Sequence, residues 1–427
     1  MASSRLTFRG WPLLPLLALL VALQIIAPSR VWMTLLVGLG LTVAVSWVWA
    51  RQMQKHVHLV RERRYTWARV GDRLEERFTL HNRSSLPVLW AEVRDESTLP
   101  GYRPGSVTGV GGSSSHRWKT YGVCRQRGVF TLGPTTLCLG DPFGLFSVAA
   151  HYPGRVPLLV MPATLNLPGI QVAPGGQLSE GRPRPHAVEP TTLAGSVRQY
   201  AAGDSLRWVH WPTSARRASW YVKTFDGSPA GAWWVILDLA RNVHHGQGQT
   251  STLEQGVTLA ASLAEMGLRA GQAIGLVGHS LEPVWLPPRP DENQRWAVLR
   301  ALATIEPGSR PLASLLQRVN GAIEQTASLV VITPDANPTW LEPLLLLRQR
   351  GLVPTVMLLT GQTGLSRMKA LYLLLMQQGI TSYLLEPDVL TPALAPAEAD
   401  DGWEWRVTPL GRSIVIRRPK DAWKSLQ

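Results

Sequence analysis

The stretch GSVRQYAAGDSLRWVHWPTSARRASWYVKTFD, residues 195–226, is the part of the sequence from which the rest of the fold is best inferred. Its Gly203-Asp204-Ser205 segment predicts a loop that closes on a helix, because the Asp204 carboxylate can accept hydrogen bonds from the free backbone N–H groups of the first turn. Pro212 is expected to end that helix early. From Ser219 onward apolar and polar residues alternate, which predicts that a strand follows the helix.

Downstream of this block, short apolar stretches alternate with longer amphipathic ones. The expected strands are Trp233–Leu239, Ala273–Val277, Leu329–Thr333, Val353–Leu359 and Thr381–Leu385. The expected helices are Leu253–Leu268, Asn293–Ile305, Leu312–Ile323, Trp340–Arg350 and Ser366–Gln378. This alternation predicts that residues 195–390 combine the block with an α/β domain built on a doubly wound parallel sheet.

Upstream of the block, residues 56–165 predict an all-β domain, because short alternating strands are separated by turn clusters such as Asn82-Arg83-Ser84-Ser85. This spacing suggests a small sandwich of immunoglobulin type. Residues 166–194 are rich in proline and glycine and predict a linker or an extended crossing segment without a core of its own. In the last region, residues 391–427, Trp403–Val407 and Ser413–Arg417 predict a terminal hairpin followed by a tail.

Two uncharged, mostly apolar runs lie near the N-terminus, at 11–27 and 31–50. Each is close to the length that a helix needs to cross a bilayer, and Pro28-Ser29-Arg30 leaves room only for a tight turn between them. Residues 1–55 therefore predict a transmembrane hairpin, with a buried hairpin of a soluble protein as the alternative. Under the positive-inside rule the flanking basic residues predict a cell-membrane protein with two spans and both termini in the cytoplasm. They are Arg5, Arg9, Arg51, Lys55, Arg61, Arg63 and Arg64.

Composition narrows the classes of partner. The chain has 427 residues and 43 Lys and Arg against 29 Asp and Glu, a net charge of +14 that suits nucleic acid or an anionic membrane surface. Many of these charges flank the apolar runs or stand singly among aromatics, which favours the membrane over nucleic acid. Only Cys124 and Cys138 are present, on what look like neighbouring strands; two cysteines exclude a disulfide framework and a four-cysteine zinc site.

The block resembles the signature of the domain of unknown function 58 family, R-x-Y-x-x-G-D-x-x-R-x-x-x-W-x-x-S-A-R followed by V-K-T-F-D. A second run resembles another motif of that family: RQRGVFTLGP at 125–134 with DPFGLF at 141–146. The resemblance extends from the predicted hairpin to about Pro387. It implies that the α/β part is similar to a von Willebrand factor type A domain. It also implies an association with MoxR-type AAA ATPases and other type A proteins in bacteria.

The residues that carry these motifs are the candidate docking and turn residues. The signature set is Arg198, Tyr200, Gly203, Asp204, Arg207, His210, Trp211, Ser214, Arg216 and Lys223. The turn set is Arg127, Gly128, Gly133, Pro134, Asp141, Pro142, Phe143 and Gly144.

Each set has a structural and a functional interpretation. The signature block could be a buried polar network or a surface for an anion or a partner. Pro212 stands where a basic residue is usual in the family, which argues against an anion, and spacing places no second acid or nucleophile beside His210 and Asp204. The sequence Asp141-Pro142-Phe143-Gly144 suits a type I turn. Its alternative role is a docking corner that exposes Phe143 and Phe146.

One candidate metal site follows the first predicted strand of the sheet. Type A domains hold a divalent ion there with D-x-S-x-S, because Mg²⁺ prefers oxygen ligands. Asp238 keeps the aspartate, but Ala240 offers no oxygen and Asn242 is a weak substitute. Thr333-Pro334-Asp335 interrupts the expected Thr-Asp-Gly. We therefore expect a degenerate site without metal; bound Mg²⁺ is the less favoured alternative, and no other cofactor is expected.

The second chemical candidate is Gly278-His279-Ser280-Leu281-Glu282, a near miss to the hydrolase nucleophile elbow G-x-S-x-G. Glu282 replaces the glycine that the strained turn needs, and no histidine follows His279 in the chain. The segment therefore predicts an ordinary turn. Taken together, the sequence favours a non-enzymatic, membrane-anchored and cytoplasm-facing interaction protein, and the family resemblance implies that it is an adaptor that assists a MoxR-type ATPase. The alternative is a metal-dependent ligand-binding protein or a hydrolase acting at the membrane.

Overall fold

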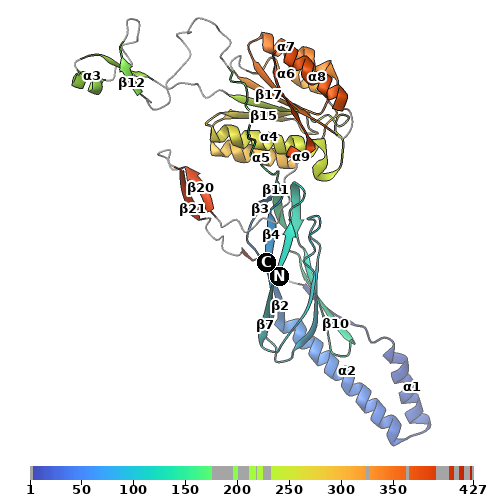
Figure 1. Ribbon diagram of the computed structural model, residues 1–427. Coiled ribbons are helices and arrows are strands. Elements are labelled where there is room, and N and C mark those ends of the chain that lie inside the picture. Colours follow the sequence, from blue (N-terminus) through green and yellow to red (C-terminus); the bar gives the residue numbers. More distant parts are fainter. Residues whose placement is uncertain are drawn as a thin grey trace. The chain divides into compact units, whose positions relative to one another are not determined.

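The computed structural model describes residues 3–175, 196–200, 211–217, 219–224, 232–323, 327–361, 365–390, 403–407, 413–417 and 424–425 (Figure 1). The chain divides into two compact units. The first, here called the β unit, comprises Met1–Ala163, Leu302–Thr304 and Pro392–Gln427. The second, the α/β unit, comprises Thr164–Ala301 and Ile305–Thr391.

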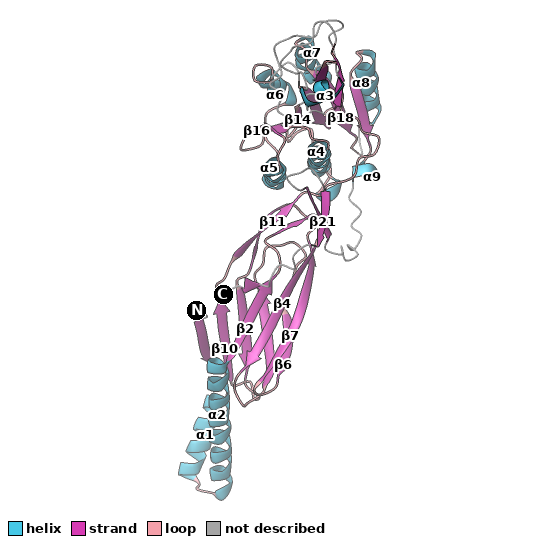
Figure 2. Cartoon of the chain, turned by 90° about the vertical axis from the view of Figure 1, so that its left-hand side faces the viewer, coloured by secondary structure: helices cyan, strands magenta, loops and turns pink. Residues whose placement is uncertain are grey.

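Three larger sheets form the body of the β unit, which also includes a two-stranded sheet described below (Figure 2). They have the strand orders β1-β10-β9-β5-β6, β22-β2-β4-β7 and β3-β11-β8. The strands are β1 Ser3–Phe8, β2 Val57–Arg63, β3 Trp67–Arg69, β4 Arg73–Asn82, β5 Val88–Asp95, β6 Ser106–Val110, β7 Ser114–Val123, β8 Gly128–Leu132, β9 Thr135–Gly140, β10 Phe146–Tyr152, β11 Val156–Met161 and β22 Lys424–Ser425. Alternate residues are buried along β9 and β10, and Phe78, Leu137 and Val148 belong to one core between the sheets. The predicted all-β domain is thus confirmed.

Strand β1 was not expected, because the first ten residues were interpreted only as the basic flank of a helical hairpin. Strand β1 pairs antiparallel with β10, from Ser3 opposite His151 to Phe8 opposite Phe146. Leu6 and Phe8 pack against the core of the β unit. The prediction missed this strand because six residues give a short alternating pattern, and its partner lies about 140 positions away in the chain.

Two apolar helices follow β1. Helix α1, Leu13–Ile26, has 14 residues, and α2, Arg30–His56, has 27. By length and composition α2 is the one helix among the described residues that could cross a membrane. It continues beyond the expected end at residue 50 and passes at Val57 directly into β2, and Ala50 and Met53 are buried in the β-unit core. The helix is therefore anchored in the folded unit.

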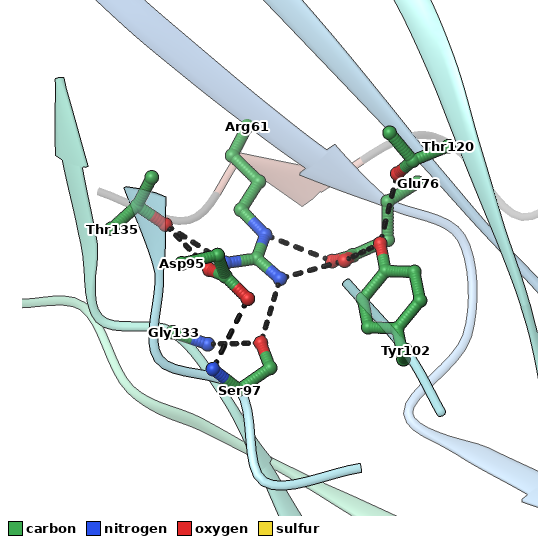
Figure 3. A network of polar contacts seen from close by, with 8 residues as sticks. All are labelled: Arg61, Glu76, Asp95, Ser97, Tyr102, Thr120, Gly133 and Thr135. Atoms are coloured by element: carbon green, nitrogen blue, oxygen red, sulfur yellow. Dashed lines mark hydrogen bonds and ion pairs between the residues drawn. The ribbon is translucent and has the colours of Figure 1, made fainter. Parts of the chain in front are cut away.

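Arg61 is buried, although it was predicted to be one of the basic residues that flank the second apolar run at the membrane. Its guanidinium donates to both Glu76 carboxylate oxygens, at 3.0 and 2.7 Å, and to Asp95 Oδ1 at 2.5 Å (Figure 3). Tyr102 Oη also donates to Glu76, and Thr135 Oγ1 donates to Asp95. Burial and the neighbouring Glu76 raise the pKa of Tyr102 above its ordinary value. This network joins β2, β4, β5 and β9, which belong to two different sheets.

Both cysteines are free. They were expected to lie on neighbouring strands, but they do not. Cys138 belongs to β9, whereas Cys124 directly follows β7 in another sheet. Burial raises the pKa of the Cys124 thiol to about 12.

The α/β unit has a six-stranded sheet of order β16-β15-β14-β17-β18-β19. Its strands are β14 Trp233–Leu237, β15 Ile274–Gly278, β16 Val284–Arg289, β17 Ser328–Thr333, β18 Val353–Leu359 and β19 Thr381–Leu385. Its helices are α4 Thr252–Arg269, α5 Glu292–Thr304, α6 Leu312–Val319, α7 Leu341–Gln349, α8 Leu365–Gln377 and α9 Pro387–Leu390. Helices α4 and α5 lie on one face and α6, α7 and α8 on the other (Figure 1). The predicted α/β sheet is confirmed.

Every expected strand and helix of this sheet is present, with ends shifted by at most four residues. The structure also contains a strand that was not expected. This strand, β16, pairs antiparallel with β15 at the sheet edge. Its sequence, VWLPPR, contains two prolines, which cannot donate to a ladder and are confined to edge strands.

Residues 164–175, most of which fall in the segment expected to be a linker or an extended crossing segment, belong to the α/β unit. Backbone N–H groups of Gln171, Ala173 and Gly175 donate to the side-chain oxygens of Tyr383, Thr355 and Ser328, at 2.8 to 3.0 Å. The acceptors belong to β19, β18 and β17, so the segment crosses three adjacent strands. The boundary expected at residue 165 falls between Ala163 and Thr164, and the rest of the expected linker, 176–194, lies outside the described residues.

Two short antiparallel strand pairs complete the described chain. Strand β12, Ser196–Gln199, pairs with β13, Tyr221–Thr224. Strand β20, Trp403–Val407, pairs antiparallel with β21, Ser413–Arg417, in the region where a terminal hairpin was predicted.

The Arg61 network predicts a large effect of Arg61→Met. The variant leaves Glu76 and Asp95 facing each other in the core, and removing one partner of a buried ion pair costs about 3–5 kcal/mol. Hydrogen exchange in detergent should show that loss as weaker protection of the amides of β2 and β4. The control is Arg94→Met, because Arg94 pairs with Glu92 at the exposed surface and its loss should leave protection unchanged. Equal protection in both variants would contradict a stabilising role for the network.

Candidate functional site

A cavity of about 710 Å³ opens in the α/β unit. It lies where β14, β17 and β18 end at their carboxyl edge, the position at which open α/β sheets bind their ligands. Its polar lining residues include Asn242, His245, Asp335, Asn337, Thr339, Thr360, Ser366 and Arg367. Because one carboxylate, one guanidinium, an imidazole, amides and hydroxyls line this cavity, it suits a polar ligand or a polar segment of a partner.

Asp238, the first residue after β14, is buried at the base of this edge. Its Oδ2 accepts from Thr333 Oγ1 at 2.7 Å, and its Oδ1 accepts from the Ala240 N–H at 3.1 Å. Burial raises the pKa of Asp238 to about 6, although these two hydrogen bonds act in the opposite direction. Both carboxylate oxygens are thus already engaged inside the unit.

Thr333 connects Asp238 to the loop that forms the cavity wall. Its Oγ1 accepts from the Asp335 N–H at 2.9 Å while it donates to Asp238. Asp335 Oδ1 in turn accepts from the Asn337 N–H at 2.9 Å, and burial raises the pKa of Asp335. The chain Asp238, Thr333, Asp335 and Asn337 therefore holds the loop after β17 in one conformation.

The residues of the expected degenerate metal site are brought together only in part. Asn242 and Asp335 line the cavity, whereas Asp238 is oriented toward Thr333 and Ala240 presents no side-chain oxygen. Across the described ranges, no three His, Cys, Asp or Glu side chains are grouped so that they could hold a metal ion. The absence of bound metal stays a prediction.

Ser280, the other chemical candidate, is tied to the backbone of Glu306. Its Oγ donates to the Glu306 carbonyl at 2.7 Å and accepts from the Glu306 N–H at 3.0 Å. The neighbouring His279 is buried, and that burial lowers the pKa of its imidazole. Ser280 therefore acts as a clamp between two loops, consistent with an ordinary turn after β15.

The signature block is only partly described. Helix α3, Trp211–Arg217, contains Pro212 in its first turn, so this proline does not end a helix as expected; a first turn tolerates proline because its N–H groups have no partner in the helix. Arg216 lies within α3 and is exposed, whereas the prediction placed it after the helix. Gly203, Asp204, Arg207 and His210 lie outside the described residues, as do the side chains of Arg198 and Lys223.

Two described contacts join the ends of the block. Ser214 Oγ accepts from the Tyr221 N–H at 2.9 Å, which fastens α3 to β13. The Tyr200 and Trp220 rings meet edge to face at 5.5 Å. Trp211 is 65% exposed, and the Arg217 guanidinium lies over the ring of Tyr221. The exposed Trp211 and Arg216 remain candidates for docking.

The turn motif forms the expected structure around Asp141. Its Oδ2 accepts from the Phe143 N–H at 3.0 Å and its Oδ1 from the Phe146 N–H at 2.6 Å. Phe143 is exposed but Phe146 is buried, so only one of the two expected aromatics is presented. Gly133 adopts φ +79, and a Cβ there would approach the Gly154 carbonyl oxygen to 2.4 Å, which explains its glycine. Arg127 and Gly128 stand at the start of β8 and Pro134 just before β9.

Sequence reasoning did not identify Thr360, Ser366 and Arg367 as cavity residues. A signal existed for Thr360, because it directly follows β18 and the carboxyl ends of adjacent parallel strands share one edge. Ser366 and Arg367 lie at the start of α8 on the surface of an amphipathic pattern, which carries no comparable signal.

The raised pKa of Asp238 predicts how stability of the sheet depends on pH. The Asp238 carboxyl has a pKa of about 6 in the folded state and about 3.9 in the unfolded chain, so it binds protons more tightly when the protein is folded. Its contribution to the free energy of unfolding is therefore most favourable below pH ~4 and is lost as the pH rises through ~6. Asp238→Asn removes the titrating group and should abolish this fall, although its amide nitrogen replaces one of the two oxygens that accept hydrogen bonds from Thr333 and Ala240. Hydrogen exchange of β14 and β17 between pH 4 and 7 tests it. Glu292→Gln, at an exposed position of α5, is the control; a parallel pH dependence in Asp238→Asn and the parent chain would refute the assignment.

Comparisons with known proteins give relatives over part of the chain. An uncharacterized protein of Mycobacterium tuberculosis is 22% identical over 161 residues, which cover 36% of this chain and 51% of the relative. The uncharacterized protein YeaD of Bacillus subtilis is 27% identical over 113 residues, 26% of each chain. The chain thus spans about half the length of the first relative and about a quarter of the second.

Among solved structures, the CARDB domain of a Pyrococcus furiosus protein matches in two determinations. The solution structure is 11% identical, covers 25% of this chain and 95% of that domain, and has a TM-score of 0.19. The crystal structure, of a complex with di-metal ions, has the same identity and TM-score and covers 90% of that domain. Residues 196–362 match the family model described as protein of unknown function DUF58, which confirms the predicted resemblance for this segment.

Proposed function

We propose that the protein is a membrane-anchored, cytoplasm-facing adaptor that binds a partner at the carboxyl edge of its α/β sheet. The observation that carries the proposal is the position of β1 and β2. One precedes the helical hairpin and the other follows it, and both belong to sheets of the same unit. A hairpin that starts and ends in one folded unit must enter and leave a membrane from the same side.

The dimensions of the helices support two spans. At 1.5 Å per residue, the part of α2 before the buried Ala50 is about 30 Å long, which equals the hydrocarbon core of a bilayer. Helix α1 is about 21 Å long and needs the flanking residues or local thinning of the bilayer to complete its crossing. The basic residues Arg5, Arg9, Arg51 and Lys55 lie on the β-unit side of both helices, and the positive-inside rule assigns that side to the cytoplasm.

The α/β unit is the part of the adaptor that recognises a partner. We interpret it as a type A-like domain and the β unit as an immunoglobulin-like sandwich. The cavity at the sheet edge of the α/β unit has a negative and a positive side chain in its lining, Asp335 and Arg367. The resemblance to the domain of unknown function 58 family implies that the partner is a MoxR-type AAA ATPase or another type A protein. The adaptor would then assist such an ATPase in the assembly or maturation of a client.

The alternative is a metal-dependent ligand-binding protein or a hydrolase acting at the membrane. It has weaker support, because the Asp238 carboxylate is already engaged by Thr333 and Ala240. Ser280 Oγ is held by the Glu306 backbone and faces no described base. These contacts favour binding of a partner without a metal ion and without a catalysed reaction. The partner that we propose is a protein and not a nucleic acid.

The proposal predicts that Thr339→Arg blocks the partner. Thr339 is exposed in the lining of the cavity, so a long charged side chain there should fill the site without disturbing the core. Tagged full-length protein is purified from detergent-solubilised membranes, and the MoxR-type ATPase is quantified by mass spectrometry. Recovery should fall at least several-fold with Thr339→Arg and stay unchanged with Glu292→Arg, an exposed position of α5 outside the cavity.

A chelator arm separates the two candidate functions. Recovery that is equal with Mg²⁺ and with EDTA supports docking without metal, whereas recovery that is lost in EDTA and in Asp238→Ala favours the metal-dependent alternative. Equal recovery from Thr339→Arg and the parent chain would contradict docking at this edge.

A further inference from the structure

The turn between β9 and β10 holds an exposed phenylalanine on a rigid frame. The buried Asp141 carboxylate binds two backbone N–H groups, and the Gly144 N–H donates to the Asp141 carbonyl at 3.2 Å with Gly144 at φ +71. Phe143 at the tip is 56% exposed. Fixing a turn costs conformational entropy. A turn that is ordered so firmly and yet exposes a phenyl ring indicates a surface that covers the ring.

This turn is bonded to the segment that leads into α1. The Arg9 N–H donates to the Leu145 carbonyl at 2.7 Å. The Phe8 ring lies 5.1 Å from that of Phe146 and 6.2 Å from that of Trp11, which is 69% exposed. Helix α1 begins two residues after Trp11. Phe143 therefore lies beside the position at which the apolar hairpin leaves the β unit.

Apolar surface continues around the base of α2. The Trp49 indole N–H donates to the Pro87 carbonyl at 3.2 Å, which ties the helix to the loop before β5. Beside this contact a groove of about 320 Å³ is lined by apolar residues only, Ala44, Val45, Val48, Trp49 and Leu86. Leu89 nearby in the sequence is 58% exposed. This surface is continuous with the helices that are proposed to cross the bilayer.

We propose that this end of the β unit lies in the membrane interface, with Phe143 and Trp11 inserted among the lipid headgroups. The inference rests on the proposed membrane anchoring and adds a lipid-binding surface to it. The Trp11 indole suits the interface because its ring is apolar while its N–H can bond to water, and the Phe143 ring adds an apolar contact. The exposed Arg9, Arg51 and Lys55 can pair with anionic headgroups. The contact fixes the angle of the β unit to the membrane.

Fluorescence quenching in reconstituted protein tests this surface. Single cysteines at Phe143, Val129 and Leu19 are introduced into the full chain on a Cys124→Ala/Cys138→Ala background and labelled with an environment-sensitive dye. The protein is placed in nanodiscs of phosphatidylcholine and phosphatidylglycerol with bromine atoms on the acyl chains near the headgroups. Val129 is the matched control, because it is 59% exposed in the same unit but lies on β8, which is paired with β11 and not with the strands next to the helices.

The dye at 143 should emit at shorter wavelength than the dye at 129 and be quenched several-fold more strongly by the brominated lipid. A dye at 143 that is unquenched overturns the inference, including the case in which its emission is blue-shifted, because a protein surface and not lipid then covers it. Leu19, in the middle of α1, separates this failure from failure of the anchoring. Position 19 is read in a second set of nanodiscs whose lipid carries bromine deep in the acyl chains. Quenching at 19 in that lipid, without quenching at 143 by bromine near the headgroups, refutes the interfacial turn alone, whereas no quenching at either position refutes both.

Discussion

The structure depends on one constraint: both ends of the apolar hairpin are built into the same β unit. On one side β1 pairs with β10 and Phe8 packs on Phe146; on the other, α2 passes into β2 without an intervening residue and buries Met53 in the core. Flexible linkers would let the helices and the folded unit move independently. Here any surface in which the hairpin is embedded also fixes the β unit, since the joint is made of sheet hydrogen bonds and core contacts.

Polar interactions within each unit follow a common physical rule. In the β unit, Arg61 is buried with two carboxylates that neutralise it and joins strands of two sheets. In the α/β unit, Thr333 satisfies the buried Asp238 and orders the loop that carries Asp335. Each group is stable in the interior only because a partner compensates its lost hydration. In both networks the compensating partner also connects separate elements, two sheets in one case and a strand with the following loop in the other.

Much of the fold could be predicted from the sequence, because burial on both faces makes a parallel strand a continuous apolar run. Strand β18 was predicted to the residue, whereas β1 and β16 were missed as short edge strands without such a run. Asp238 and Asp335 were identified from motif spacing, yet their hydrogen-bond partners depend on side-chain orientation. The burial of Arg61 was not predictable, because its carboxylate partners are 15 and 34 residues away and a lone arginine after an apolar helix resembles a flanking charge.

The central claim is that the hairpin crosses a membrane and returns to the side of the β unit. Single cysteines at Pro28, in the turn between α1 and α2, and at Ser3, at the start of β1, test it most directly. Intact cells are treated with a membrane-impermeant thiol reagent before and after the membrane is opened. The account predicts that position 28 is labelled in intact cells and position 3 only after opening. Labelling of position 28 only after opening, or of position 3 in intact cells, would contradict it.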